Sequence, residues 1–524
     1  MKPCATVCLL LAVCPALGQW SADPGTNLVI GDRSGEQVQP KVRALPDGSC
    51  YISWLDNAAG GYDTYLQRLD AAGVEQWPRN GLRITDFSQS STQDYGLDVD
   101  ADGNALVAFR SDLGGTIQIS AQKVAPDGTF LWGANGVQVT NVSGISVNNP
   151  KITALDDGTV VVGWSQATGI GLQKVNAAGL VQWAAGGVLT APTTGSYGMC
   201  DVKPGGGGAV IVLMQRPLGA NPITSNKHLA TQKFDASGTP LWNEGTPLVI
   251  FDANSVQNGY FPTFEPDGAG GAVYGWYERG GSRNALLQRV RSDGVEMYTH
   301  NGVPANTTAG KDRLSPWMAY DAATDTAYLA WTQTNITIQN SWGVYAQKFV
   351  GGVRQWGDDG IEILPQTADQ NSFVRCTVSG DGVMVAWFEK PGNSRVLATR
   401  LDSAGTASWI PAIREVTSVL TSKGRLDMAG TAGGCAYLTW HDGRGTANDI
   451  IAQAVTADGD LGPCPAASCP ADFNNDGGVD GADVEAFYIV WEAGEAGADV
   501  NGDGGIDGGD VETFFAAWEA GGCG

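Results

Sequence analysis

The stretch AQKVAPDGTFLWGANG, from Ala121 to Gly136, decides the fold of this chain. It predicts a short strand carrying Gln-Lys, a turn at Pro-Asp-Gly, and a run through a Trp to a Gly. Related stretches begin at positions 66, 172, 231, 287, 346, 399 and 452, so successive copies lie 51 to 59 residues apart. Thr399 itself stands in the Gln place of the seventh copy. The other copies carry the Gln, at Gln67, Gln122, Gln173, Gln232, Gln288, Gln347 and Gln453. A period of this length with strand-like contents predicts a radial or stacked repeat architecture.

Each repeat contains four predicted strands. An approach strand ends in a turn, as at positions 40–48, and an apolar strand then ends on an aromatic residue. The Gln strand follows, and a short Gly-led strand comes after a second Trp, as at positions 81–85 and 136–140. Most of the 17 Trp residues belong to this pattern: Trp54, Trp164, Trp276, Trp331, Trp387 and Trp440 end the second strand, and Trp77, Trp132, Trp183, Trp242, Trp356 and Trp409 precede the fourth. Four antiparallel strands per repeat are the content of a propeller blade.

The number of approach strands predicts an eight-bladed β-propeller, in a mainly β chain. They begin near Val38, Asp94, Val147, Tyr197, Asn258, Leu314, Asn371 and Gly424. Seven blades are the alternative, because the unit around Arg400 is degenerate. The last unit stops after its third strand, and the segment near 27–31 resembles the missing fourth strand. We therefore expect a propeller over residues 19–462, whose last blade is completed by that N-terminal strand and whose ring is thereby closed.

Residues 1–18 have the features of a signal peptide. Lys2 supplies a positive start, Val7 to Val13 an apolar core, and Ala16 and Gly18 the small residues before a cleavage site. A lipoprotein signal ending at Cys14 is a weaker alternative. No later run approaches the ~18 apolar residues of a membrane span. We therefore expect a secreted, extracellular protein that is associated with the cell surface and has no membrane span.

The charge distribution excludes one class of partner. The formal net charge is -24, and residues 464–524 contain 13 Asp or Glu and no Lys or Arg. The sequence has no basic stripe that could follow a phosphate backbone, so nucleic acid is not an expected partner. Three of the ten Cys residues lie in the predicted signal, and the odd number left predicts at least one thiol unpaired within the chain. Cys50, Cys200, Cys376 and Cys435 fall in predicted strands, where we interpret them as small buried apolar residues.

After a Cys- and Pro-rich linker at 463–470, the pattern changes to two acidic twelve-residue segments, 472–483 and 499–510. Oxygen-bearing side chains occupy positions 1, 3, 5, 9 and 12, and Gly occupies position 6, which is the spacing of a calcium loop. Each segment leads into the same apolar helix pattern, in which Val484, Phe487 and Trp491 recur as Val511, Phe514 and Trp518. We predict two Ca²⁺ ions and metal-dependent folding of residues 471–524. The predicted metal-site residues are Asp472, Asn474, Asp476, Gly478, Asp480 and Asp483 in one loop and Asp499, Asn501, Asp503, Gly505, Asp507 and Asp510 in the other.

Two family resemblances follow from these motifs. The repeats over about 27–462 resemble a propeller repeat of secreted bacterial proteins, in which AQ[KR] and a later Trp mark each blade. The tail resembles a dockerin domain, and its flanking Cys residues and Gly-Gly-Cys-Gly end are similar to GC-type dockerin tails. That resemblance implies a cohesin-like or cell-envelope attachment partner. It also allows a disulfide between Cys469 and Cys523 that would leave Cys464 unpaired.

The sequence marks no catalytic centre. His228, His300 and His441 are isolated and are interpreted as surface residues, and no phosphate loop or nucleophile motif is present. A pair of carboxylates across the channel could serve a glycosidase, and candidates follow the second-strand aromatics at Asp56, Glu278, Glu389 and Asp442. Polar turn residues are the competing interpretation of these four. The leading hypothesis is a non-catalytic propeller that displays a surface for a polysaccharide or protein ligand and is tethered through its tail. The alternative is a carbohydrate-active enzyme, a glycoside hydrolase or lyase of polysaccharide catabolism, on the same propeller.

Overall fold

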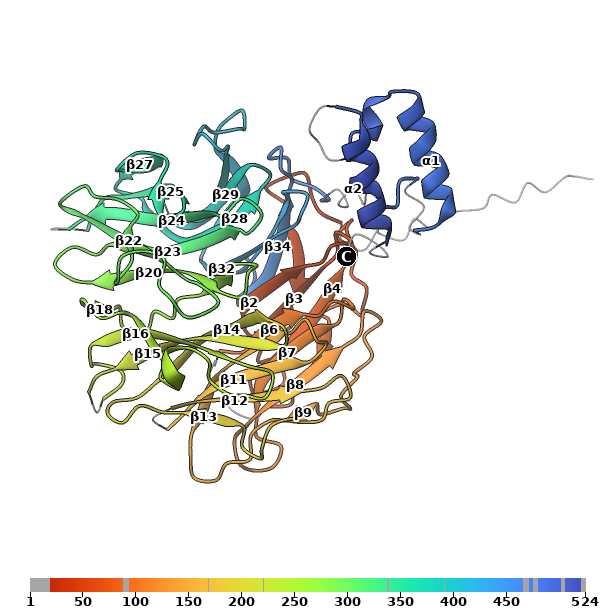
Figure 1. The fold of residues 1–524 in the computed structure, drawn as a ribbon. Coiled ribbons are helices and arrows are strands. Elements are labelled where there is room, and N and C mark those ends of the chain that lie inside the picture. The colour runs from red at the N-terminus through yellow and green to blue at the C-terminus, as the bar shows by residue number, and fades with distance from the viewer. Residues whose placement is uncertain are drawn as a thin grey trace, which may run out of the picture.

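The computed structural model describes residues 19–87, 94–167, 169–219, 221–336, 339–390, 392–464, 471–474, 479–500 and 505–519. The predicted signal at 1–18 and most of the linker, with Cys469, lie outside them, as does Cys523. The described residues form eight antiparallel sheets arranged around an axis, followed by two helices (Figure 1). The prediction of an eight-bladed propeller with four antiparallel strands per blade is confirmed.

The innermost strand of each blade is the predicted approach strand. Neighbouring inner strands contact one another all the way round, and the last contacts the first, so the ring is closed. From blade 1 to blade 8 they are β2 (Gln37–Ala44), β6 (Gly96–Val99), β10 (Val147–Ala154), β14 (Gly198–Gly206), β19 (Phe264–Pro266), β23 (Lys311–Asp321), β28 (Gln370–Ser379) and β32 (Lys423–Gly430). The fifth begins later than the position near Asn258 that the sequence predicted. Pro262 precedes it, and a proline has no N–H to donate to a strand ladder.

The second and third strands form the buried centre of each sheet. The second strands are β3 (Cys50–Asp56), β7 (Ala105–Ser111), β11 (Val160–Gln166), β15 (Ala209–Pro217), β20 (Ala272–Arg279), β24 (Thr326–Asn335), β29 (Gly382–Lys390) and β33 (Ala436–Asp442). The third strands are β4 (Asp63–Leu69), β8 (Gln118–Val124), β12 (Gly169–Val175), β16 (Lys227–Phe234), β21 (Ala285–Val290), β25 (Trp342–Val350), β30 (Ser394–Leu401) and β34 (Asp449–Val455). The Trp residues predicted to end the second strands lie two to four residues before the strand ends and are fully buried. Hydrophobic clusters fill the spaces between neighbouring blades.

The outer strands are β5 (Leu82–Arg83), β9 (Val137–Gln138), β13 (Val188–Thr190), β17 (Leu248–Phe251), β22 (Val303–Pro304), β27 (Ile361–Thr367), β31 (Arg414–Thr421) and β1 (Leu28–Gly31). Two short strands, β18 (Ser255–Val256) and β26 (Val353–Arg354), add to blades 5 and 6, and η1 (Asn243–Gly245) is a single 3₁₀ turn. Several outer strands are shorter than the sequence predicted. The Gly that leads them is required: at Gly81 and Gly136 φ is positive, and a Cβ would lie 2.3 Å from a carbonyl oxygen of the third strand.

The repeated Gln and Trp residues hold each blade and connect it to the next. In blade 2 the Gln122 Oε1 accepts from the backbone N of Lys123 and of Trp132, and its Nε2 donates to Gly133 O. The Trp132 Nε1 then donates to Ala177 O in the turn of blade 3, at 3.1 Å. The same bond, from the indole Nε1 to a backbone carbonyl of the following blade, is made by Trp77, Trp183, Trp242, Trp356 and Trp409. The interpretation of the repeated Gln as a hydrogen-bonding strand residue is confirmed.

The ring is closed by both ends of the propeller. β1 pairs with β34, with Leu28 opposite Ala452, and supplies the outer strand of blade 8. Cys435, directly before the second strand of that blade, forms a disulfide with Cys464. The expectation that Cys464 is unpaired was therefore wrong, as was the interpretation of Cys435 as a simple buried thiol. Sequence spacing alone does not fix disulfide connectivity. Cys50, Cys200 and Cys376 are buried free thiols, as predicted.

The tail contains α1 (Gly481–Glu492) and α2 (Gly508–Glu519), joined through the 3₁₀ turn η2 (Ala496–Ala498). The two helices share one apolar cluster, in which the Phe487 and Phe514 rings stack with centroids 4.3 Å apart. Neither helix is long and apolar enough to span a membrane, and the same holds for the rest of the described chain.

Candidate functional site

A cavity of about 1180 Å³ lies in the centre of the propeller, and all eight inner strands or the segments leading into them contribute to its wall. We call this cavity the channel. Its wall is polar and charged as well as aromatic, although the chain has few charged residues overall. A concave site with a small number of convergent polar groups is the usual form of a ligand site.

Strand register determines which side chains reach the channel. One residue of each inner strand pairs with the residue just before the second-strand aromatic, and its side chain forms the first level of the channel wall. Examples are Lys41 opposite Ser53, Lys151 opposite Gly163, and Arg375 opposite Ala386. Asp201, Trp317 and Asp427 occupy the same level in blades 4, 6 and 8. Since strand side chains alternate, a second level follows two residues later. It contains Arg43, Asp98, Lys203 and Glu265.

A β-bulge precedes the first level in several blades. The register shifts between Val38 and Lys41, and Gln39 adopts a positive φ of 55°. Asn149, Ser315, Phe373 and Arg425 have the same positive φ two residues before their channel residue. Bulges redirect the strand and its side chains, and they are frequent beside functional sites. Here they lie at one end of the channel in blades 1, 3, 6, 7 and 8.

Two lysines of the channel share one carboxylate. The Lys41 Nζ lies 2.9 Å from Asp94 Oδ1, and Lys151 Nζ bonds to Asp94 Oδ2. Burial opposes ionisation of Asp94, but the two ammonium groups outweigh it and hold the pKa of this carboxyl far below its usual range. Burial lowers the pKa of Lys41. Burial opposes the charge of Lys151 as well, but the Asp94 and Asp201 carboxylates outweigh it and raise the pKa of that lysine. The cluster therefore carries more positive than negative groups.

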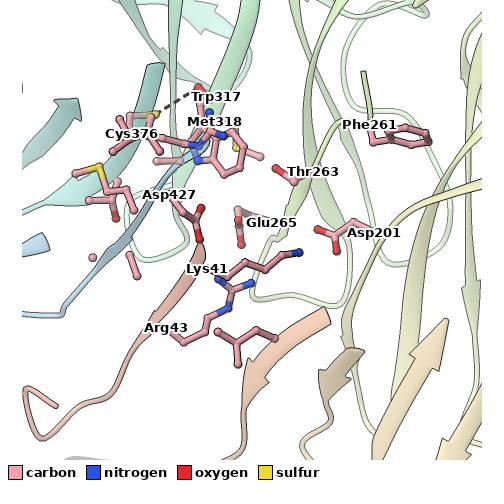
Figure 2. Close-up of a pocket in the computed structure, with 18 of the residues that line it drawn as sticks. Lys41, Arg43, Asp201, Phe261, Thr263, Glu265, Trp317, Met318, Cys376 and Asp427 are labelled. Atoms are coloured by element: carbon pink, nitrogen blue, oxygen red, sulfur yellow. Dashed lines mark hydrogen bonds between the residues drawn. The ribbon is translucent and has the colours of Figure 1, made fainter. Parts of the chain in front are cut away.

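The second level holds two looser ion pairs. Arg43 Nε lies 3.8 Å from Asp98, and Lys203 Nζ lies 4.0 Å from Glu265. Enclosure in the channel raises the pKa of Glu265; Lys203 opposes the shift, and the nearby Asp201 carboxylate adds to it. Figure 2 shows Lys41, Arg43, Asp201, Glu265 and Asp427 reaching into one space from four strands. Asp98 and Asp427 also bond to backbone N–H groups of the next inner strand, at Ala154 and Val42, and so connect blades.

Aromatic side chains form part of the same wall. Trp317 on β23 is half-buried, and the guanidinium carbon of Arg375 lies 3.9 Å from its ring centroid. Phe261 is 47% exposed and Tyr260 packs edge-on against Tyr277. Burial raises the pKa of Tyr260 well above its usual value, so its hydroxyl stays protonated at neutral pH. The wall therefore combines apolar ring faces with charged groups.

The strand-end carboxylates singled out from the sequence do not line this channel. Each bonds within its own blade: Asp56 to Ala58 N, Glu278 to Asn254 and Asn284, and Glu389 to Arg395. Asp442 accepts from Trp440 Nε1 and Thr421 and pairs with Lys423 and Arg444. The idea of a carboxylate pair across the channel from this set was wrong, because these residues lie at the far ends of second strands. They act as polar strand-end residues.

The histidines also lie away from the channel wall. His300 is exposed between Glu296 and Asp252, as a surface residue. His228 and His441 lie on strands and are half-buried, and burial lowers the pKa of His441 to about 4. The surface interpretation was therefore wrong for these two.

The predicted metal-site residues fall partly within the described chain. Asp476, Gly478, Asn501 and Asp503 lie outside it, and the described members are Asp472, Asn474, Asp480, Asp483, Asp499, Gly505, Asp507 and Asp510. Within the described residues, no three His, Cys, Asp or Glu side chains meet as a metal site. Asp483 is fully buried and accepts from Asn474 N and Asp480 N, and Asp510 is fully buried and accepts from Asp507 N.

The two halves of the tail are also linked reciprocally. Trp491 Nε1 in α1 donates to Asp507 O at 3.1 Å, and Trp518 Nε1 in α2 donates to Asp480 O at 3.2 Å. Each helix thus holds the segment that precedes the other helix.

Comparison with known proteins gives no family for this chain. No family model matches it, and no curated protein matches it. Among solved structures, it is similar to a polysaccharide lyase described as PL25-ulvanlyase, at 11% identity and a TM-score of 0.43, over 72% of this chain and 96% of that one. The polysaccharide lyase Uly1 aligns at 13% identity and a TM-score of 0.43, over 85% and 94%. The α-L-arabinanase of Penicillium chrysogenum aligns at 10% and 0.35, over 82% and 98%. At these values the similarity is one of fold.

Proposed function

We propose that this chain is a carbohydrate-active propeller that binds a saccharide in its central channel. The observation that carries the proposal is the composition of the channel wall, where the half-buried Trp317 and the exposed Phe261 stand among charged groups from several blades. A sugar ring presents an apolar face and a rim of hydroxyl groups, and such a ligand needs both kinds of contact. Aromatic rings supply large rigid contact area, and ionised side chains make the stronger hydrogen bonds.

A panel of soluble and insoluble polysaccharides tests this proposal on the full chain. We expect at least one polymer to deplete the protein from solution, and Trp317→Ala to lose most of that retention. Leu241→Ala removes an apolar side chain that is 49% exposed outside the channel, and it serves as the control. Retention that is unchanged in Trp317→Ala and lost in Leu241→Ala would place the ligand outside the channel.

A second candidate function, hydrolysis of a glycosidic bond, is favoured by the carboxylates of the channel. Their surroundings push the pKa of Glu265 up and that of Asp94 down. Pairs of carboxyls with such divergent pKa values divide acid and base roles in glycosidases. Glu265 would protonate the leaving oxygen, while an ionised carboxylate of the channel would take a proton from the attacking water. This proposal assigns Glu265 the acid role.

Release of reducing ends from the retained polymer tests this second function. Glu265→Gln keeps the shape of the side chain and removes the transferable proton, so we expect hydrolysis to fall at least about 100-fold while retention persists. Elimination by a lyase also creates one reducing end per bond broken, but it leaves an unsaturated sugar on the other fragment, so reducing ends that appear together with ultraviolet absorbance would instead indicate a lyase. Release that is unaffected in Glu265→Gln would remove Glu265 from the reaction.

For the tail we propose two Ca²⁺ sites and a role in attachment to a cohesin-like or cell-envelope partner. The donor groups are side-chain and backbone oxygens, which suit a hard cation, and Asp483 and Asp510 are buried acidic groups that turn towards their own loops. Bound Ca²⁺ would offset the repulsion of the clustered carboxylates. Export through residues 1–18 and a location at the cell surface complete this proposal.

A further inference from the structure

The charge of the channel wall is distributed unevenly between its two sides. Blades 7, 8 and 1 follow one another round the ring and contribute Arg375, Arg425, Lys41 and Arg43, with Asp427 among them. Blades 4 to 6 contribute a mainly acidic side, with Asp201, Glu265 and Asp321 against one lysine, Lys203, and this side also carries the aromatic residues Phe261 and Trp317. The chain has a formal net charge of -24, so a group of basic side chains on the inner wall differs from the rest of the molecule. Such a group indicates a binding site for an anionic ligand.

Arg375 is the cation in this sector whose geometry is best defined. Its guanidinium lies over the Trp317 ring, and its Nη1 donates to Val374 O at 3.0 Å. Its Nε has no hydrogen-bond partner among the described residues, although this atom is shielded from solvent. Burial lowers the pKa of Arg375, and the Asp427 carboxylate opposes this. Because Nε is shielded, a ligand in the channel would contact the outer nitrogens of the guanidinium rather than this atom.

The Lys41–Lys151 cluster provides a second cationic group on the wall. Asp94 is the carboxylate that both ammonium groups contact, while Asp427 lies near Lys41 and Asp201 near Lys151 and each offsets part of the positive charge. Asn149, at the bulge of the same strand as Lys151, bonds to Met199 O and holds this part of the wall to blade 4. The position of the lysines is therefore fixed by the ring rather than by a mobile loop.

We propose that the saccharide bound in the channel carries an oxyanion, a carboxylate or a sulfate ester, and that Arg375 binds this group beside the Trp317 ring. This inference rests on the proposed saccharide function of the channel. A guanidinium offers parallel N–H donors that match the oxygens of a carboxylate or sulfate, and stacking on a Trp ring fixes its plane. The sugar ring that carries the oxyanion would then lie against the aromatic side of the channel. The Lys41–Lys151 cluster would attract a second oxyanion of the same chain.

Titration of the full-length protein tests the inference, with three soluble polymers as probes: a polygalacturonate, a sulfated galactan and a neutral β-glucan. We expect binding of at least one of the two charged polymers, weakened by added NaCl because the contacts are charged. In Arg375→Gln the affinity for that polymer should fall at least about tenfold. The uronate and the sulfated polymer distinguish the two oxyanions.

Two further variants make the result specific. Arg291→Gln removes an exposed arginine outside the channel that is paired with Asp293, and it should bind as the wild type does. Arg375→Lys keeps the charge but not the planar donors, so it should recover only part of the affinity. Its melting temperature, measured beside that of Arg375→Gln, shows whether the fold is retained.

The outcomes separate the inference from the function on which it rests. Preference of the wild type for the neutral glucan, or equal affinity of Arg375→Gln and wild type for the charged polymers, would overturn the inference and leave saccharide binding in place. No binding of any of the three polymers would overturn both. Loss of charged-polymer binding in Arg375→Gln but not in Arg291→Gln supports the inference.

Discussion

The guanidinium carbon of Arg375 lies 3.9 Å from the centroid of the Trp317 ring, across the boundary between two neighbouring blades. The two residues occupy the same level of β28 and β23, each opposite an Ala of its second strand. The contact places a cation and an aromatic face together in the channel wall. This combination, more than the fold, gives the channel its chemical character.

The charge balance of the channel predicts the behaviour of Asp94→Asn. The substitution removes the carboxylate that Lys41 and Lys151 share, so both ammonium groups lose their counter-ion. We expect affinity for an anionic saccharide to rise several-fold at low salt, and this gain to shrink as salt is added. Calorimetric titration at two NaCl concentrations measures both effects.

Asp102→Asn is the matched control, because it makes the same change of charge at an exposed turn. If Asp94→Asn binds the anionic ligand no better than Asp102→Asn, the lysine cluster does not face the ligand.

The repeated Gln residues predict a stability effect. Gln232 is fully buried; its Oε1 accepts from Lys233 N and Trp242 N, and its Nε2 donates to Trp242 O. Gln232→Ala leaves these backbone groups unpaired in a buried site, and the free energy of unfolding should fall by about 2–4 kcal/mol. Urea unfolding followed by Trp fluorescence measures this change.

Gln182→Ala supplies the comparison, since Gln182 is exposed and its side chain donates to the nearby Leu180 O. Its unfolding free energy should change by less than about 0.5 kcal/mol. Equal effects of the two substitutions would show that the repeated Gln is not a structural residue.

Asp442 predicts a pH dependence in blade 8. Burial opposes its ionisation, but bonds from Arg444, Thr421, Lys423 and Trp440 lower its pKa from 3.8 to about 2. Because the folded pKa is depressed, this stabilisation is complete above the unfolded pKa and is lost as the pH falls through about 2. It amounts to about 2 kcal/mol. Burial lowers the pKa of the partner Lys423, so we assign the loss of stability at low pH to the Asp442 carboxylate and not to Lys423.

The difference in unfolding free energy between wild type and Asp442→Asn measures this contribution. It should stay constant from pH 7 to about pH 5 and shrink below that value. A difference that shrinks between pH 7 and pH 5 would assign the effect to another group.

Removal of calcium should act on the tail and leave the propeller folded. A chelator should abolish the helical circular dichroism of α1 and α2, and added Ca²⁺ should restore it. Trp491 and Trp518 each bond to the opposite half, so both halves should lose structure together. The thermal transition of the propeller should not move. Helical signal that persists in excess chelator would contradict the calcium proposal.

The sequence predicted the blades well because each blade repeats the same structural requirements. The repeated Gln and Trp, such as Gln122 and Trp132, make the same hydrogen bonds in successive units, so their regular spacing can be recognised in the sequence. The residues of the channel wall were not predicted, because they differ from one unit to the next. Lys41, Asp201 and Trp317 occupy the same level and have nothing else in common. An alignment of the approach strands, searched for the position that varies most in charge, would have found them.

The most direct test of the account is a crystal structure of the chain soaked with an oligosaccharide of the polymer it retains best. We expect density for the sugar in the central channel, with one ring against Trp317 and an oxyanion at Arg375. Sugar density on the outer edges of the blades, with none in the channel, would contradict it.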